Sequence, residues 1–256
     1  MPNWVTQRLV ITGDKEAIAS VKAQLSKPYT SHHWDFESKS IGHRVIEGDF
    51  LLWNIIQPTN LEVYYDYAKL IADEEARQDK PVKQNSVDDV VGMIQERLDS
   101  ITQEDFTNFA QQFHKDVSIG QDWYHWNIRN WGTKWEISHA FLETDRDIQL
   151  GYCFESAWSP IVPALNELAA CYPSLVMTLR FIDEGDGFAG EMHWANRELT
   201  YEAELDITHG LKEEMYGECW ACSGGNENDP ELEEYRTNLR CAEFNTKIEI
   251  EIEGAI

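Results

Sequence analysis

The sequence contains no long apolar run. Nowhere in its 256 residues does an apolar stretch approach the roughly 18 uncharged residues of a membrane-spanning helix, so we do not expect an integral membrane protein. Residues 1–8 also lack the basic flank followed by an apolar core that is typical of a secretory signal. We therefore expect the chain to remain in the cytosol of its host cell.

Basic residues are scarce and do not cluster. There are 21 Lys and Arg against 46 Asp and Glu, which gives a formal net charge of -25. Residues 183–256 alone hold 20 of the acidic residues and only five of the basic ones. Phosphate contacts require clustered cations, so direct nucleic-acid binding is disfavoured and a partner with a basic site is favoured. A purely solubilising role for the acidity is the alternative.

Sequence motifs of the common enzyme classes are missing. The chain contains no Gly-rich phosphate loop, no nucleophile elbow and no metalloprotease helix motif, and Ser, His and Asp are too scattered to indicate a triad. We therefore predict no catalytic residue.

The apolar pattern that is present predicts an α+β protein. In the first half it predicts a strand over residues 4–12, a helix over 15–25, a strand over 45–56 and a helical insertion over about 61–113. In the second half it predicts a strand over 150–155, a helix from about 160 to 171 and strands over 175–182, 188–194 and 199–205. This order favours an antiparallel sheet with helices on one face. We predict an N-terminal region over 1–120 and a second domain over 121–256 that ends in an acidic extension.

The aromatic segment over residues 123–135 could form a stacking platform for bases or could belong to the core. A stacking platform needs a basic groove, which this acidic chain lacks, so we predict packing at a corner of the sheet.

Cysteine occurs five times, an odd number in a chain large enough to form a core without disulfides, and we expect mostly reduced thiols. Cys219 and Cys222 have the spacing of a redox pair or of half a zinc site, which Cys241 and His209 could complete. Ordinary buried thiols are the third interpretation, and we predict no obligatory cofactor.

Two short motifs carry a resemblance to a known family. The sequences NWGTKW at 130–135 and AWSP at 157–160, together with the opening MPNW, resemble YubB-type ferredoxin-like proteins. The resemblance covers about a third of the chain. It implies a ferredoxin-like fold and an origin on plasmids, genomic islands or phages, and it implies no biochemical activity.

The hypothesis that follows is an acidic binding protein that imitates nucleic acid and inhibits a host defence or DNA-handling complex by occupying its basic groove. A small-ligand or thiol-redox enzyme that uses Cys219 and Cys222 or a ferredoxin-like cleft is the alternative. The predicted acidic face combines a polar helix with an alternating C-terminal strand: Glu231, Glu233, Glu234, Glu249, Glu251 and Glu253.

Overall fold

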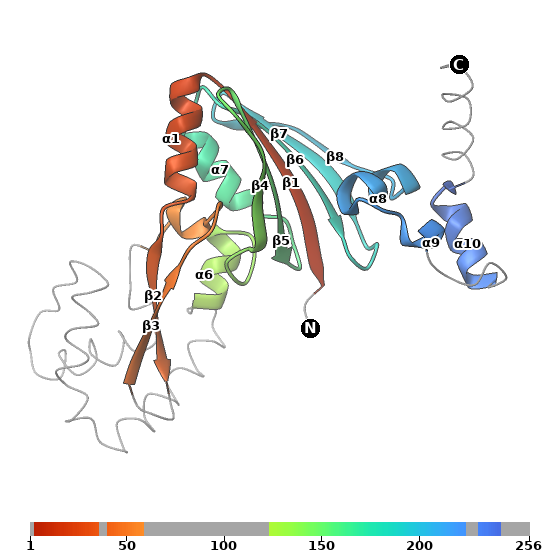
Figure 1. Cartoon of the computed structure of the whole chain (residues 1–256), viewed down its shortest axis with the longest axis horizontal. Helices are drawn as coiled ribbons and strands as arrows, with labels where there is room; N and C mark the ends of the chain where they lie inside the picture. Colours follow the sequence, from red (N-terminus) through yellow and green to blue (C-terminus); the bar gives the residue numbers. More distant parts are fainter. Residues whose placement is uncertain (1–2, 36–39, 59–122, 224–229, 242–256) are drawn as a thin grey trace, which may run out of the picture. The chain divides into compact units, whose positions relative to one another are not determined.

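The computed structural model describes residues 3–35, 40–58, 123–223 and 230–241 (Figure 1). The chain divides into two compact units. The first contains residues 1–18, 138–160 and 169–256, and the second contains residues 19–137 and 161–168. The predicted helical insertion over 61–113 and the predicted domain boundary at residue 120 lie outside the described residues.

The first unit is built on a six-stranded antiparallel sheet in the order β4-β5-β1-β6-β7-β8. The strands are β1 (Trp4–Thr12), β4 (Ser138–Arg146), β5 (Gln149–Ala157), β6 (Val176–Asp183), β7 (Ala189–Ala195) and β8 (Glu198–Glu204). Their alternation of apolar and polar residues is typical of strands whose two faces differ in exposure. The predicted α+β class and antiparallel sheet are confirmed.

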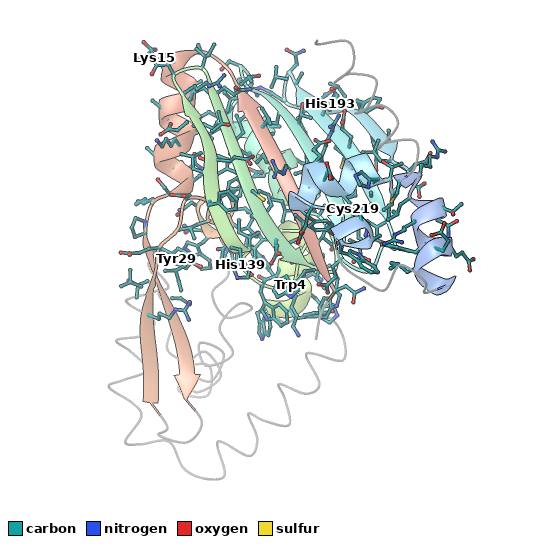
Figure 2. The ribbon with its side chains drawn as sticks, turned by 45° about the vertical axis from the view of Figure 1, so that its right-hand side comes forward. Trp4, Lys15, Tyr29, His139, His193 and Cys219 are labelled. Atoms are coloured by element: carbon teal, nitrogen blue, oxygen red, sulfur yellow. The ribbon has the colours of Figure 1, made fainter. Side chains whose placement is uncertain are left out.

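One face of this sheet is buried at its centre, where β5, β1 and β6 lie side by side. Leu9 lies opposite both Tyr152 and Leu179, and at most 1% of the surface of each of the three is exposed. The sequence places β1 in the N-terminal region, yet β1 hydrogen-bonds with β5 on one side and β6 on the other. The centre of the sheet therefore joins distant parts of the sequence. Trp4 and Lys15, labelled in Figure 2, mark the starts of β1 and of the following helix α1 (Lys15–Leu25).

The opposite face of the sheet carries helix α8 (His209–Tyr216). Leu211 and Met215 of α8 form a buried cluster with Ile182 of β6 and Ala189 of β7. Ile182 lies opposite Thr6, and neighbouring residues of a strand point to opposite faces. The cluster with α8 is therefore on the face opposite to that of Leu9. Helix α8 is thus anchored to the sheet, and α9 (Trp220–Ser223) and α10 (Pro230–Asn238) follow it along the chain.

The second unit contains a hairpin of β2 (Tyr29–Asp35) and β3 (Ser40–Ile46), the 3-10 helix η1 (Leu52–Asn54) and α6 (Trp123–Asn130). The predicted strand over 45–56 is wrong, because β3 ends at Ile46 and the apolar run that follows forms η1. A short buried apolar run has no periodicity that separates a strand from a turn of helix.

The aromatic segment begins as a helix and not as a corner of the sheet. Its packing role is nevertheless confirmed for Trp131, which is 1% exposed and donates from Nε1 to the Ile56 carbonyl at 3.0 Å. Helix α7 (Val162–Cys171) confirms the predicted helix at 160–171. Among the described residues, no helix is long and apolar enough to span a membrane.

Candidate metal centre

Helix α8 fixes the position of His209, its first residue. The Thr208 hydroxyl caps the helix by accepting a hydrogen bond from the Leu211 N–H, and Gly217 ends it in the left-handed conformation at φ 81°. The His209 N–H donates to the Leu239 carbonyl at 2.8 Å, which ties the start of α8 to the chain after α10. Only 2% of His209 is exposed, so its imidazole lies inside the fold.

Cys219 directly precedes α9, and Cys222 lies on the single turn of that helix. The Cys222 N–H donates to the Cys219 carbonyl at 2.9 Å, so the backbone folds back between the two cysteines. Cys219 is buried, whereas Cys222 is exposed. This is the local arrangement that the two-residue spacing predicts for a pair of metal ligands.

Cys241 follows the end of α10 and is buried. Helix α10 is held against α9 by Arg236, whose Nε donates to the Ala221 carbonyl at 2.7 Å. Trp220 of α9 also stacks on Tyr235 of α10, with ring centroids 4.9 Å apart. These contacts place Cys241 beside the other two cysteines.

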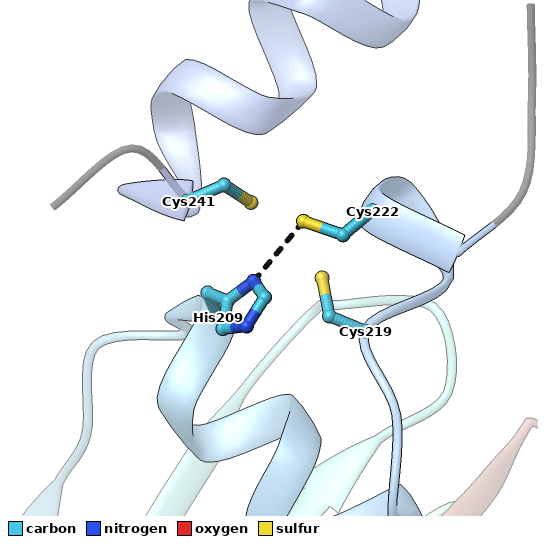
Figure 3. Close-up of side chains that lie close together, drawn as sticks. All are labelled: His209, Cys219, Cys222 and Cys241. Atoms are coloured by element: carbon cyan, nitrogen blue, oxygen red, sulfur yellow. Dashed lines mark hydrogen bonds between the residues drawn. The ribbon is translucent and has the colours of Figure 1, made fainter. Parts of the chain in front are cut away.

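All four predicted ligands converge on one point, as Figure 3 shows. The three thiol sulfurs and an imidazole nitrogen lie within 4.8 Å of one another. Cys222 Sγ and His209 Nδ1 are 3.2 Å apart. Three short segments separated in sequence thus direct four donor atoms into one small space.

Burial favours the protonated thiols of Cys222 and Cys241 in the absence of a cation. Burial first, and then a hydrogen bond with Cys222, raise the pKa of Cys241 to about 12. Burial likewise raises the pKa of Cys222. A catalytic thiol needs a lowered pKa, so this environment does not favour the thiol-redox alternative. A bound metal ion would stabilise the thiolate forms instead.

Glu213 lies beside the imidazole and was missed by the sequence interpretation. Its Oε1 is 3.2 Å from His209 Nε2, whereas Cys222 Sγ lies beside the other ring nitrogen, Nδ1. The separation of four residues along α8 was the signal that could have identified it. Metal-bound histidines commonly have a carboxylate in this position, where it orients the ring.

The predicted acidic face is described only in part. Glu233 and Glu234 are exposed on α10, and Glu231 belongs to the same helix. Glu249, Glu251 and Glu253 lie outside the described residues, so the predicted acidic strand stays a prediction.

Comparisons with known proteins identify the domain that contains most of the sheet. Residues 130–217 match the family model described as a ferredoxin-like domain in Api92-like protein, which confirms the predicted ferredoxin-like domain. A crystal structure of protein api92 from Yersinia pseudotuberculosis aligns with 80% of this chain and 98% of that chain, at 9% sequence identity and a TM-score of 0.41. No curated protein matches the sequence. The matched range includes His209 and ends before the three cysteines of the cluster.

Proposed function

We propose that the protein is an acidic binding protein that occupies a basic nucleic-acid groove on a host protein complex, imitating phosphate charge. The observation that carries the proposal is a set of exposed carboxylates without an ion pair among the residues that the structure describes. Within residues 198–223 and 230–241, five exposed glutamates have no basic side chain of the described residues within 4.0 Å: Glu198, Glu202, Glu204, Glu218 and Glu234.

The basic residues of this region, and Arg180 of the neighbouring strand β6, form ion pairs within the protein. Arg180 pairs with Glu191 and also with Glu214 at 2.7 Å. Lys212 is buried against Asp186, at 2.6 Å. Arg240 lies 3.7 Å from Asp206. These pairs leave few positive groups to offset the exposed glutamates, so the outward charge of the region is negative.

Strand β8 presents part of this charge at a spacing suited to phosphate imitation. Glu202 and Glu204 lie opposite Met192 and Gly190 of β7, so the two carboxylates share one face of an edge strand. Alternate residues of a strand are separated by about 6.8 Å. That distance equals the rise of about two nucleotides along one strand of duplex DNA. A groove lined by Lys and Arg would meet both carboxylates.

The YubB-type resemblance supports a host target. The resemblance implies an origin on plasmids, genomic islands or phages, and proteins of such elements encounter host defence and DNA-handling complexes. The proposal assigns no catalytic residue, and it gives the ferredoxin-like sheet the role of a scaffold for charged side chains.

Affinity capture from host lysate at two salt concentrations tests the proposal. We expect a captured protein that dissociates at high salt and is displaced by added duplex DNA, because both ligands would use the same basic groove. Glu202→Gln with Glu204→Gln should weaken capture. The matched control, Glu16→Gln with Glu47→Gln, removes the same charge from exposed positions elsewhere and should not. Capture that DNA cannot displace, and that both double variants retain equally, would contradict the proposal.

A further inference from the structure

We propose that His209, Cys219, Cys222 and Cys241 bind one Zn²⁺ ion in a closed tetrahedral site that fastens α9 and α10 to α8. The proposal goes beyond the binding function, and it rests on the convergence of four donor atoms from three segments.

The distances suit a tetrahedral ion after small side-chain rotations. Zn–S bonds of about 2.3 Å and Zn–N bonds of about 2.0 Å place neighbouring ligand atoms roughly 3.5 to 3.8 Å apart. Here the donor atoms lie within 4.8 Å of one another, and Cys222 Sγ is 3.2 Å from His209 Nδ1. Each side chain therefore needs to move by about an ångström or less, with no rearrangement of the backbone.

The donor set selects zinc and a structural role. Three thiolates and one imidazole in a tetrahedral arrangement are typical of zinc. All four positions are filled by protein atoms, so none is open to a substrate. Zn²⁺ binding would release the thiol protons to solvent and leave the sulfurs as thiolates. Glu213 would complete the site by accepting a hydrogen bond from His209 Nε2–H, which leaves Nδ1 as the donor toward the metal.

Among the described residues, the hydrophobic core around the cluster is small. It contains five buried residues, two of which are the ligands Cys219 and Cys241, with Ile207 and Tyr235 partly buried against them. The other three are Ala221, Leu232 and Leu239. This core is small for helices of four and nine residues, and small folds commonly use a metal ion as an additional cross-link. Zinc would supply such a cross-link between the three segments.

Elemental analysis of the untagged protein, purified under reducing conditions, is the first test. We expect one zinc ion per chain, and after replacement of zinc by Co²⁺ we expect tetrahedral d–d bands with thiolate-to-cobalt charge transfer. A chain that takes up no zinc when it is supplied in reduced form would overturn the proposal. Iron in place of zinc, or a disulfide among these cysteines in the freshly isolated protein, would overturn it as well.

Single substitutions identify the ligands. Cys222→Ser is the most informative because Cys222 is exposed and its replacement disturbs no packing. We expect it to weaken Zn²⁺ binding by more than tenfold, whereas Cys222→His should retain a tetrahedral cobalt spectrum with one thiolate fewer. Cys171→Ser is the matched control, since Cys171 is an exposed thiol at the end of α7. Equal zinc affinity in Cys222→Ser and Cys171→Ser would exclude this ligand set. Because no partner is needed, the result is independent of the binding function.

Discussion

His209 and Cys222 face each other across 3.2 Å, with imidazole Nδ1 directed at the thiol, although 12 residues separate them in the chain. The other imidazole nitrogen lies at 3.2 Å from Glu213. The ring thus has the Cys222 thiol beside one nitrogen and the Glu213 carboxylate beside the other.

Glu213→Gln should weaken zinc binding without abolishing it. The amide oxygen can still accept from His209 Nε2–H, but the loss of charge makes the imidazole a poorer donor to the metal. We expect a loss of affinity of about 10-fold, at the low end of the effect of outer-shell partners. Competition with a chromogenic zinc chelator measures it. Glu218→Gln removes an exposed carboxylate of the same region and should leave the affinity unchanged.

Lys212→Met should destabilise the attachment of α10 to the sheet. Lys212 Nζ donates to Asp186 Oδ2 at 2.8 Å and to the Tyr235 hydroxyl at 2.6 Å, and its side chain is 3% exposed. The substitution leaves Asp186 partly buried without its cation, at a cost on the order of 3 kcal/mol. Chemical denaturation checks the free energy of unfolding. If the free energy of unfolding changes by less than about 0.5 kcal/mol, the range typical of neutral surface substitutions, this ion pair contributes little to stability.

The buried carboxyl group of Glu136 should make the stability of the second unit depend on pH. Its carboxylate accepts hydrogen bonds from the N–H groups of Leu52 and Trp53 and from the Tyr29 hydroxyl. Burial nevertheless raises its pKa from 4.5 to about 7. The folded state therefore holds a proton that the unfolded state has released between pH 4.5 and about pH 7. Stability should fall across this window as the pH rises, by on the order of 1 to 3 kcal/mol.

Glu136→Gln isolates the pH-dependent contribution, because glutamine does not titrate and keeps one of the two acceptor oxygens. Denaturation at several pH values should give a flatter dependence between pH 5 and 7 in the variant than in the parent chain. A variant with the same slope as the parent would show that other groups cause the dependence.

Much of the fold could be predicted from the sequence because local pattern and final environment agree. Residues 4–12 and 15–25 have the apolar spacing of a strand and a helix, and β1 and α1 have these bounds. The prediction for residues 123–130 was wrong because their local pattern and their final environment disagree. Aromatic residues favour strands, but Asn127 is buried and its side chain donates to the Lys134 carbonyl at 2.7 Å, a contact that a helix followed by a turn provides.

The candidate metal centre was predictable only in outline. The spacing of Cys219 and Cys222 indicates a ligand pair from sequence alone. The approach of His209 and Cys241 depends on the packing of α8, α9 and α10, including the hydrogen bond from His209 N–H to Leu239. Such contacts between segments have no signature in the spacing of residues, which is why three interpretations of the cysteines remained open.

Leu168→Asp should unfold the chain or destabilise it by more than about 3 kcal/mol, because Leu168 is fully buried in α7 and an aspartate there would lack a cation. Ala170→Asp places the same charge on the exposed side of the helix and should cost much less. Thermal melting of the two variants compares them. Similar melting temperatures would contradict the assignment of Leu168 to the core.

The salt dependence of association with the captured host partner tests the binding function most directly. Stopped-flow or surface-based kinetics over a range of salt concentrations gives the slope for the parent chain, for Glu202→Gln with Glu204→Gln, and for Glu16→Gln with Glu47→Gln. For Glu202→Gln with Glu204→Gln we predict slower association and a weaker dependence of its rate on salt, because charge at the contact speeds the encounter with the partner. Glu16→Gln with Glu47→Gln should behave like the parent chain. Equal rates and equal slopes for all three proteins would contradict a contact through β8. If substitutions across the acidic segment, including Glu249, Glu251 and Glu253 changed together to Gln, also leave both quantities unchanged, the acidity serves solubility and not recognition.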